Sequence, residues 1–386
     1  MNHIYHKRIK RHIIAQEHEF FSIMQPGFEE AAQKEVTLCG LKLKEESETG
    51  GFLATGKLED MYRLHIQSKT INRVIMRITT FYADSFSTLE KKLQQIPWEL
   101  YFNNGDDISV KVSSSKSKLI HRTAIEERAV KQINSVTLDK GIILSSKPTD
   151  SPQVIFIRGN HDLFTVSIDC SGELLYKRGY KDATHPAPIR ETTAAAILQS
   201  SGFLETDILL DPLCGSGTFS LEALNMTLAP SETIKRSFAF MKWPSFKDKT
   251  YEYLLKNEAP IRNDTPEIYT SDIDEKHLDS AKKNINSLLP ENSVIFSQKD
   301  FFKNTIQLPE GKKGLIVINP PYGHRLENSS EFYKNLGLIL KDSYRDWGYG
   351  IIVAGETNEK HMALKPDKKI LFFNGGIKAA LLIKMP

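Results

Sequence analysis

A glycine-containing turn between an apolar strand and a helix constrains the fold of this chain more than any other feature. Residues 208–210 are apolar and strand-like, residues 219–228 have helical spacing, and the segment between them reads Asp-Pro-Leu-Cys-Gly-Ser-Gly-Thr. Because glycine has no side chain and tolerates positive φ, Gly215 and Gly217 let a ligand approach the backbone closely. The turn predicts one βα unit of an open α/β sheet, with a small-molecule site at its edge.

The residue pattern of the turn also limits the classes of ligand that it can bind. The third glycine of a dinucleotide fingerprint is missing, and no Gly-Lys-Ser/Thr follows, as a P-loop would require. A cofactor without phosphate remains, and S-adenosylmethionine is the common one; an ordinary tight βα turn is the alternative. The candidate cofactor residues within the turn are Asp211, Cys214, Gly215, Gly217 and Thr218.

Longer β-α repeats follow residue 172 and predict a parallel sheet with crossover helices. Seven apolar segments alternate with helical ones, which is typical of a doubly wound, Rossmann-like α/β sheet. The predicted strands are residues 208–213, 268–272, 294–297, 314–319, 350–355, 369–373 and 378–384.

Two acidic residues stand at the ends of later predicted strands. Asp272 is the last residue of the second strand, where a carboxylate commonly accepts the ribose hydroxyls of a nucleoside. Asp300 follows the third strand and precedes two phenylalanines, so it can accept the adenine amino group beside an aromatic wall. Either aspartate alone is more often a helix N-cap. Together with the glycine turn they predict a nucleoside site at the carboxyl edge of the sheet, where open α/β sheets bind ligands.

The sequence Asn319-Pro320-Pro321-Tyr322 follows the fourth predicted strand and indicates the chemistry. The exocyclic amine of a base is a weak nucleophile because its lone pair is delocalised into the ring. The Asn319 side-chain oxygen and the Pro320 carbonyl can both accept hydrogen bonds from one NH₂ group, and the prolines fix these acceptors in place. Tyr322 offers a face on which a base can stack. The motif predicts methyl transfer to an amine; a plain Pro-Pro-Tyr loop is the alternative.

The excess of positive charge lies in the first 180 residues, which hold 25 Lys and Arg against 22 Asp and Glu. A basic stretch at residues 109–131 can hold a polyanion, although a solvated face gives the same pattern. The candidate RNA-binding residues in this stretch are Lys111, Lys116, Lys118, His121 and Arg122.

The first half of the chain predicts two smaller α+β units. Strands are expected at residues 20–24, 52–55, 74–81, 108–112, 154–158 and 163–169, and helices at residues 26–39, 58–67, 88–96 and 121–133. We therefore expect a basic arm at residues 1–19 that is disordered, a first unit at 20–81, a second unit at 82–172, and the large sheet at 173–386.

The apolar runs and the cysteines of the sequence indicate in which cellular compartment the protein is expected. No run approaches the ~18 apolar residues of a membrane helix, and the N-terminus lacks the apolar core of a secretory signal. The three cysteines, Cys39, Cys170 and Cys214, are too few and too far apart for a disulfide framework or a metal knuckle. We expect a cytoplasmic protein that neither enters a membrane nor binds a metal.

These residues, in this order, resemble the THUMP-containing class I methyltransferases that modify the exocyclic N2 of guanine in RNA. The segments that carry the resemblance are residues 21–29, 114–121, 178–181, 187–192 and 319–323, together with Arg325. The resemblance covers nearly the whole chain, and the most similar type is the bacterial enzyme that methylates 23S rRNA of the large ribosomal subunit.

The resemblance implies a ferredoxin-like unit at residues 20–81, a THUMP unit at 82–172 that holds RNA, and a methyltransferase domain from residue 173. It implies that S-adenosylmethionine binds at Asp211, Gly215, Gly217, Asp272 and Asp300, that Asn319 to Tyr322 form the catalytic motif, and that Arg325 contacts RNA. A tRNA guanine-N2 methyltransferase and a DNA adenine-N6 methylase remain alternatives, since both can use the same motif. A catalytically silent RNA-binding assembly factor is the non-enzymatic alternative.

Overall fold

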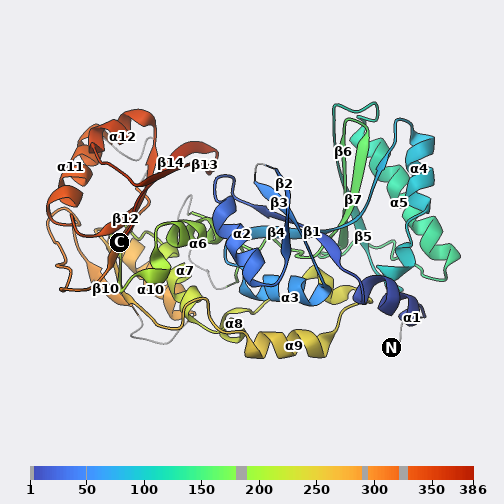
Figure 1. Cartoon of the computed structure of the whole chain (residues 1–386), viewed down its shortest axis with the longest axis horizontal. Coiled ribbons are helices and arrows are strands. Elements are labelled where there is room, and N and C mark those ends of the chain that lie inside the picture. The colour runs from blue at the N-terminus through green and yellow to red at the C-terminus, as the bar shows by residue number, and fades with distance from the viewer. Residues whose placement is uncertain (1–3, 49, 180–188, 289–293, 321–328) are drawn as a thin grey trace.

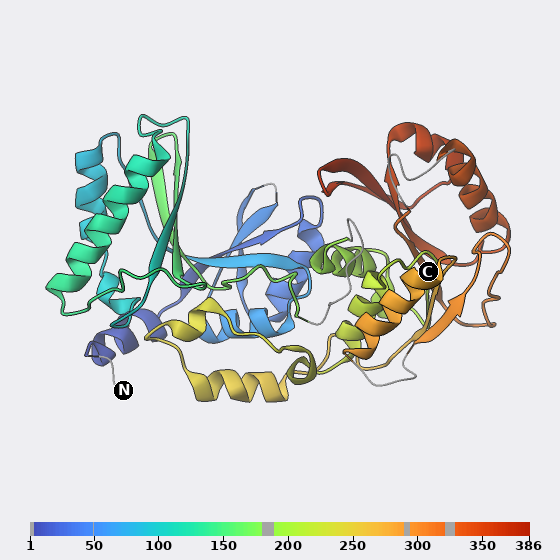
Figure 2. The same cartoon turned by 180° about the vertical axis from the view of Figure 1, so that it is seen from behind.

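The chain folds around two seven-stranded sheets that lie side by side along its long axis (Figures 1 and 2). The structure is a computed structural model, and it describes residues 4–48, 50–179, 189–288, 294–320 and 329–386. The first sheet and its helices come from residues up to Asp169, and the second sheet begins at Ile208.

The N-terminal sheet has the strand order β2-β3-β1-β4-β7-β6-β5. Its strands are β1 His18–Met24, β2 Lys42–Glu48, β3 Gly51–Gly56, β4 Ile71–Tyr82, β5 Ile108–Ser115, β6 Gln153–Asn160 and β7 Leu163–Asp169. The twelve-residue β4 pairs with β1 on one side and with β7 on the other. Only β5 and β6 pair in parallel. One continuous sheet therefore runs through both units of the first half.

Helices cover one face of this sheet, because apolar residues alternate along its strands. Along β1, Phe20 and Met24 are buried in the core while Phe21 and Ile23 lie on the other face, less buried. The covering helices are α2 Glu29–Leu38, α3 Leu58–Gln67, α4 Phe86–Gln94 and α5 Arg122–Asp139. The β2 strand was not predicted from sequence, because its run of charged residues carries little apolar signal.

The N-terminal segment corrects the expectation of a disordered arm. Residues His6–Ile9 form a short helix, α1, which continues as one π-helical turn at Lys10–Ile14. Ile9 and Ile13 are buried in the core of the first half, and the Arg8 guanidinium pairs with the buried Glu99 carboxylate at 2.5 Å. Burial of these two apolar side chains offsets the entropy cost of ordering the segment.

The C-terminal sheet has the strand order β10-β9-β8-β11-β12-β14-β13. Its strands are β8 Ile208–Asp211, β9 Glu267–Asp272, β10 Ile295–Gln298, β11 Gly314–Ile318, β12 Gly348–Ala354, β13 Lys368–Asn374 and β14 Ile377–Lys384. All seven predicted strands are confirmed. The first five strands pair in parallel, as the β-α repeats predict, whereas β14 departs from this pattern and runs antiparallel to both β12 and β13. The short turn between β13 and β14 permits no crossover helix, so the two strands form a hairpin.

Helices pack on both faces of this sheet, as expected of a doubly wound fold. Leu209, Leu315 and Val317 belong to the core on one face, whereas Leu210 and Ile316 belong to the core on the other. The first face is covered by α6 Glu191–Ser200, α7 Thr218–Thr227 and α10 Glu275–Asn286, and the second by α11 Ser329–Asp342 and α12 Glu356–Met362.

A segment of the second half packs back onto the first half. It contains α8 Pro230–Thr233, a 3-10 turn at Ala239–Lys242 and α9 Asp248–Asn257, and α9 lies against α3 (Figures 1 and 2). The Phe240 ring stacks on Tyr62 of α3, with centroids 4.8 Å apart. Both rings are buried in the core of the first half.

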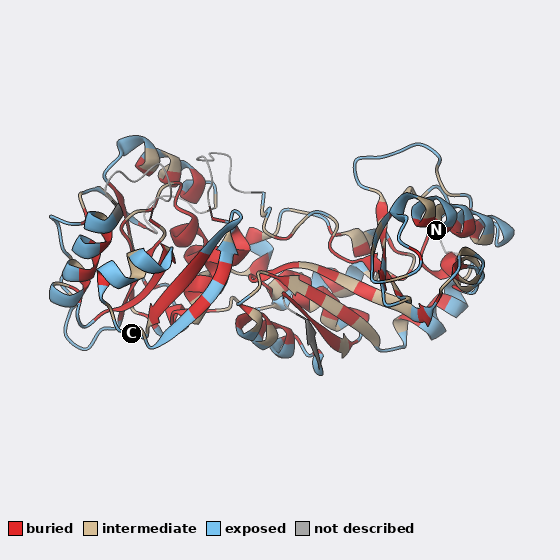
Figure 3. Ribbon diagram, turned by 90° about the horizontal axis from the view of Figure 1, so that it is seen from above, coloured by how far each residue is buried: buried red, intermediate tan, exposed pale blue. Residues whose placement is uncertain are grey.

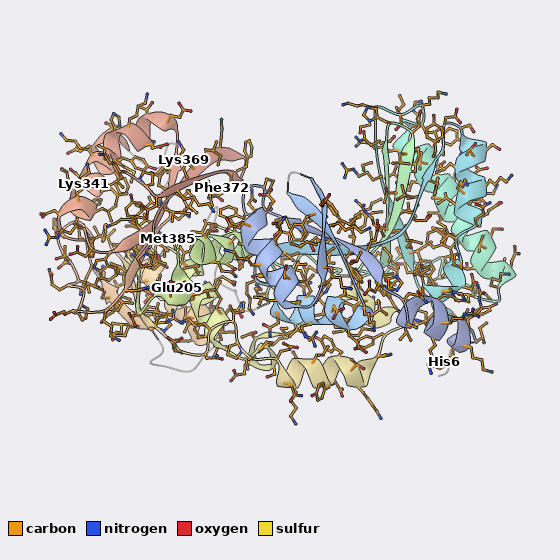
Figure 4. The ribbon with its side chains drawn as sticks, viewed as in Figure 1. His6, Glu205, Lys341, Lys369, Phe372 and Met385 are labelled. Carbon is orange, nitrogen blue, oxygen red and sulfur yellow. The ribbon has the colours of Figure 1, made fainter. Side chains whose placement is uncertain are left out.

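The far edge of the C-terminal sheet also meets the first half. Phe372 of β13, labelled in Figure 4, makes an edge-to-face contact with Phe28 just before α2, with centroids 5.3 Å apart. The Lys368 ammonium pairs with Glu30 of α2 at 2.6 Å. Because α9 and β13 contact the first half at separate places, the two sheets are held in a defined relation.

Candidate functional site

The glycine turn joins the end of β8 to the start of α7. Gly215 and Gly217 have φ values of 52° and 76°, in the left-handed region that favours glycine. A Cβ at Gly215 would meet nothing within 4 Å, so the backbone there faces open space. A Cβ at Gly217 would lie 2.9 Å from the Cβ of Ala281 on α10. Gly215 therefore leaves room for a ligand, whereas Gly217 allows α7 and α10 to pack closely.

The Asp272 carboxylate is fixed at the end of β9, next to this turn. It accepts hydrogen bonds from the backbone N–H of Gly215 and of Asp274, each at 3.0 Å. The Nδ1 atom of His277 lies 3.3 Å from its Oδ1. A carboxylate has about four acceptor positions, so these bonds orient Asp272 and leave capacity for a ligand's hydroxyl groups.

Asp211 lies beneath the turn. Its side chain is 1% exposed and accepts a hydrogen bond from the Ser220 hydroxyl at 3.0 Å, and Ser220 in turn contacts Thr270 at 2.6 Å. Burial raises the pKa of the Asp211 carboxyl to about 7. The contacts of Asp211 that the structure describes thus support the turn from inside.

Cys214 and Thr218 are also enclosed. The Cys214 side chain is 8% exposed, and burial raises the pKa of its thiol above the usual range, which keeps it protonated and unreactive. Its backbone N–H donates to the Ser271 carbonyl at 3.0 Å and ties the turn to β9. Thr218 is the first residue of α7 and is 4% exposed.

Asp300 follows β10 and organises a short turn. Its Oδ1 accepts the backbone N–H of Phe302 at 3.0 Å, and its Oδ2 pairs with Lys303 at 3.0 Å. Phe301 is buried and stacks on Tyr344, whereas Phe302 is 36% exposed. The aromatic wall expected beside Asp300 is therefore split between one buried ring and one exposed ring.

Asn319 and Pro320 follow the last residue of β11. Because Ile316 pairs with Leu210 of β8 in parallel register, Asn319 stands at the same sheet edge as the glycine turn. Asn319 is half-buried and Pro320 is buried. The remaining residues of the motif, Pro321 and Tyr322, lie outside the described residues, and so does Arg325.

The predicted RNA-binding residues that the structure describes lie in three places. Lys116 and Lys118 lie in the loop after β5, where Lys118 pairs with Asp84 at 3.0 Å. His121 and Arg122 stand at the start of α5 and line a shallow hollow of about 570 Å³. Lys111 is separate, exposed on β5 over a different hollow of the sheet. The basic stretch therefore does not form one continuous surface.

Sequence reasoning missed His277. This residue lies in the first turn of α10, with its Nε2 atom 3.7 Å from Asp274 and its Nδ1 atom close to Asp272. The spacing Asp-x-Asp-x-x-His at a strand end is a signal that could have identified it.

Among the described residues, no cluster of His, Cys, Asp and Glu could hold a metal ion, and no helix is long and apolar enough to cross a membrane.

Comparison with protein families agrees with this geometry. Residues 178–383 match a family described as RMKL-like, methyltransferase domain. Residues 19–75 match a family described as the RlmL ferredoxin-like domain. The first match contains the glycine turn, Asp272, Asp300 and Asn319. The second contains β1 to β3 and the start of β4.

Two relatives match along nearly the whole chain. A Synechocystis protein with the provisional name RNA methyltransferase slr0064 is 28% identical over 373 residues, which cover 94% of this chain and 95% of that protein. The ribosomal RNA large subunit methyltransferase K/L of Cellvibrio japonicus is 29% identical over 386 residues, which cover 95% of this chain and 51% of that enzyme. The chain thus spans about half the length of the K/L relatives.

Two solved structures share the fold. SMU.472, provisionally named a methyltransferase and solved with SAH, is 27% identical with a TM-score of 0.84, and the match covers 96% of this chain and 98% of that one. A Listeria monocytogenes protein provisionally named an N6-adenine-specific DNA methylase is 26% identical with a TM-score of 0.84, covering 96% and 97%. Both halves of the chain, and not the C-terminal sheet alone, are present in these structures.

Proposed function

The chain belongs to the RMKL-like methyltransferase family, and from this premise we propose that it methylates the exocyclic N2 of a guanine in 23S rRNA with S-adenosylmethionine as the methyl donor. The observation that carries the proposal is the carboxyl edge of the C-terminal sheet. There Asp272 is hydrogen-bonded to the backbone of the glycine turn, and Asn319 directly follows β11, which neighbours the turn's own strand β8. The name of the K/L relative supports ribosomal RNA as the substrate.

The described residues fit the cofactor. The open side of Gly215 leaves space for a nucleoside, and the Asp272 carboxylate is oriented to accept hydrogen bonds from two ribose hydroxyls. Asp300 has a partly exposed carboxylate that can accept from the adenine amino group. The SAH bound in SMU.472 supports this assignment, since that chain matches this one over almost its full length. The cofactor supplies a methyl group activated by its bond to a positively charged sulfur.

Asn319 and Pro320 are assigned to the guanine amine. Hydrogen bonds from the N2 amino group to the Asn319 side-chain oxygen and the Pro320 carbonyl draw the nitrogen toward sp³ geometry. Its lone pair then points away from the ring, toward the methyl donor. Because Pro320 is buried and follows a fully buried strand, its carbonyl is held in place before the substrate arrives, which is the condition for electrostatic catalysis.

The first half of the chain is assigned to the RNA. We take residues 20–81 as the ferredoxin-like unit and residues 82–172 as the THUMP unit, with Lys116, Lys118 and Arg122 on the phosphates. The match of residues 19–75 to the ferredoxin-like domain supports the first of these units. The protein acts in the cytoplasm in this account, and its three buried free thiols fit a reducing compartment.

One specific observation favours a second function. The Listeria protein with nearly the same fold carries the name of an N6-adenine-specific DNA methylase, and an Asn-Pro-Pro-Tyr motif suits an adenine amine as well as a guanine amine. The match to the K/L enzyme, of which this chain spans about half the length, favours RNA instead.

One experiment separates these functions. The purified protein is incubated with S-adenosylmethionine carrying a labelled methyl group and with unmodified 23S rRNA, tRNA or duplex DNA in parallel. Digestion to nucleosides then identifies the labelled base. The proposal expects N2-methylguanosine from 23S rRNA. Label in tRNA alone, label on adenine N6 in DNA, or no label in any nucleic acid would point to the tRNA enzyme, the DNA methylase or a silent binding protein, respectively.

A further inference from the structure

A broad hollow of about 670 Å³ lies on the face of the N-terminal sheet that the helices leave open. Its lining comes from all seven strands of that sheet, and the edge strand β2 contributes Lys44. Figure 3, which views the molecule from above, shows intermediate and exposed residues along these strands among the buried ones. The hollow is separate from the glycine turn, since all of its described lining residues belong to the N-terminal sheet.

One row of paired residues crosses this face over five neighbouring strands. Glu19 of β1 lies opposite Arg77 of β4, Arg77 opposite Ser167 of β7, Ser167 opposite Phe156 of β6, and Phe156 opposite Lys111 of β5. Neighbouring strands are ~4.8 Å apart, so the row spans roughly 19 Å. All five residues line the hollow. The surface is therefore continuous across both units of the first half.

Aromatic rings and guanidinium groups are paired on this face. The Arg77 guanidinium lies over the Phe21 ring, 5.3 Å from its centroid, and the Arg73 guanidinium lies over the Phe156 ring at 5.7 Å. Both rings are only half-buried. A phenyl ring and a planar guanidinium each offer a flat surface on which a nucleobase can stack.

The charge of the hollow is positive. Among the side chains that the structure describes, four cations and one anion line it, and the anion, Glu19, is paired with Lys44. Within the described part of the chain, neither Arg77 nor Lys111 forms an ion pair, and both line the hollow. Cations without a carboxylate partner on a concave surface attract a polyanion.

We infer that this open sheet face binds a single-stranded segment of the RNA substrate, with bases stacked on Phe21, Phe156 and the guanidinium groups over them. The inference rests on the proposed function and adds a second RNA surface to the loop at Lys116. A duplex keeps its bases stacked inside and cannot use these rings. A peptide that extends a sheet needs the backbone groups of an edge strand, which a sheet face does not offer.

Fluorescence anisotropy tests this surface. The full-length protein is titrated into a labelled single-stranded RNA dodecamer, and separately into the same strand annealed to its complement, over a range of salt concentrations. The charge variant is Arg77→Ala with Lys111→Ala, and its matched control is Lys249→Ala with Lys256→Ala on α9. The stacking variant is Phe156→Ala, and its matched control is the exposed aromatic change Tyr253→Ala. Circular dichroism and cofactor affinity establish that each variant is folded.

The charge variant should bind the single strand at least about tenfold more weakly. Its log–log salt dependence should flatten by about 1.4, or ~0.7 for each phosphate that the protein no longer neutralises. Phe156→Ala should weaken single-strand binding by about fivefold or more with the salt dependence unchanged, because stacking releases no counterions. The two controls should bind as the wild type does.

Two outcomes would contradict the inference about the sheet face, and a third would contradict the proposed function. If the variants of this sheet face bind RNA like the wild type while the protein still methylates rRNA, the inference about the sheet face is wrong and the proposed function stands. Tighter binding of the duplex than of the single strand also overturns that inference. If the wild type neither binds nor methylates any RNA, the proposed function itself fails.

Discussion

The backbone N–H of Gly215 donates a hydrogen bond to the Oδ2 atom of Asp272 over 3.0 Å. This bond joins the glycine turn after β8 to the end of β9. The glycine turn and Asp272, which the sequence predicts as separate features, therefore form one site. The backbone N–H of Asp274 donates a hydrogen bond to the other carboxylate oxygen, and the two bonds together fix the orientation of the carboxylate. The cofactor affinity of the protein should therefore depend on Asp272 more than on any neighbouring acid.

Replacing Asp272 with alanine removes an acceptor for both ribose hydroxyls and releases the turn. We expect Asp272→Ala to weaken S-adenosylmethionine binding by about 1.5–3 kcal/mol, the range for hydrogen bonds to a charged group. Isothermal titration calorimetry measures this. The matched control is Asp279→Ala, an exposed acid on α10 that should leave the affinity unchanged. Wild-type affinity in Asp272→Ala would remove the ribose assignment.

Asp211 should make stability depend on pH. Its folded-state pKa of about 7 lies above the unfolded value of ~3.9, so its contribution is fully present below about pH 4 and is lost as pH rises through 7. Asp211→Asn keeps the size and removes this titration. Urea unfolding at pH 4.5 and pH 7.5 should show the wild type losing stability relative to the variant, by up to about 3 kcal/mol between these two pH values at ~1.4 kcal/mol for each pKa unit. Equal changes in the two proteins would place the Asp211 carboxyl in a solvated setting.

The loop after β5 should contribute to RNA binding in a way that does not depend on sequence. The combined change of Lys116, Lys118 and Arg122 to alanine should weaken binding to all RNAs and flatten the log–log salt dependence by roughly 0.7–0.9 for each phosphate left without its cation. Lys118 should contribute least, because Asp84 already pairs with it. Cofactor binding should stay unchanged. An unaltered salt dependence would identify the loop as a solvated surface only.

The two halves should unfold as one unit because Phe240 is inserted into the core of the first half. Phe240→Ala should cost about 3–5 kcal/mol, the usual range for a buried phenylalanine, and should separate the urea transition into two steps. The control is Phe373→Ala on β13, whose ring is 56% exposed. A single transition of unchanged midpoint in Phe240→Ala would mean that the stack on Tyr62 does not couple the halves.

Regular hydrophobic periodicity made much of the fold predictable from sequence. The β7 strand and the α3 helix have the predicted bounds, because each buries one face and shows the matching period. The charged edge strand β2 and the N-terminal helix gave no such signal, since only Ile9 and Ile13 of the latter are buried. An apolar run predicts a strand but not the direction in which the strand pairs. The antiparallel pairing of β14 could therefore not be predicted from its sequence.

The site was predictable to the extent that its residues adjoin strand ends. Gly215 and Asn319 come after strands and Asp272 ends one, and parallel strands bring their carboxyl ends to one edge. The part played by His277 and the burial of Asp211 depend on packing between α7, α10 and β9, which no local pattern reveals. The row across Arg77 and Phe156 depends on pairing between strands far apart in the sequence, so only the structure could reveal it.

Single-turnover methyl transfer by Asn319→Ala tests the central claim most directly. Labelled methyl is followed from S-adenosylmethionine to a 23S rRNA fragment, with nucleoside analysis for N2-methylguanosine and with Asn286→Ala, an exposed residue of α10, as the control. The account predicts that Asn319→Ala binds cofactor and RNA nearly normally but transfers methyl about 10²–10³-fold more slowly, because it lacks one preorganised acceptor in the transition state. Undiminished transfer by Asn319→Ala would contradict the mechanism.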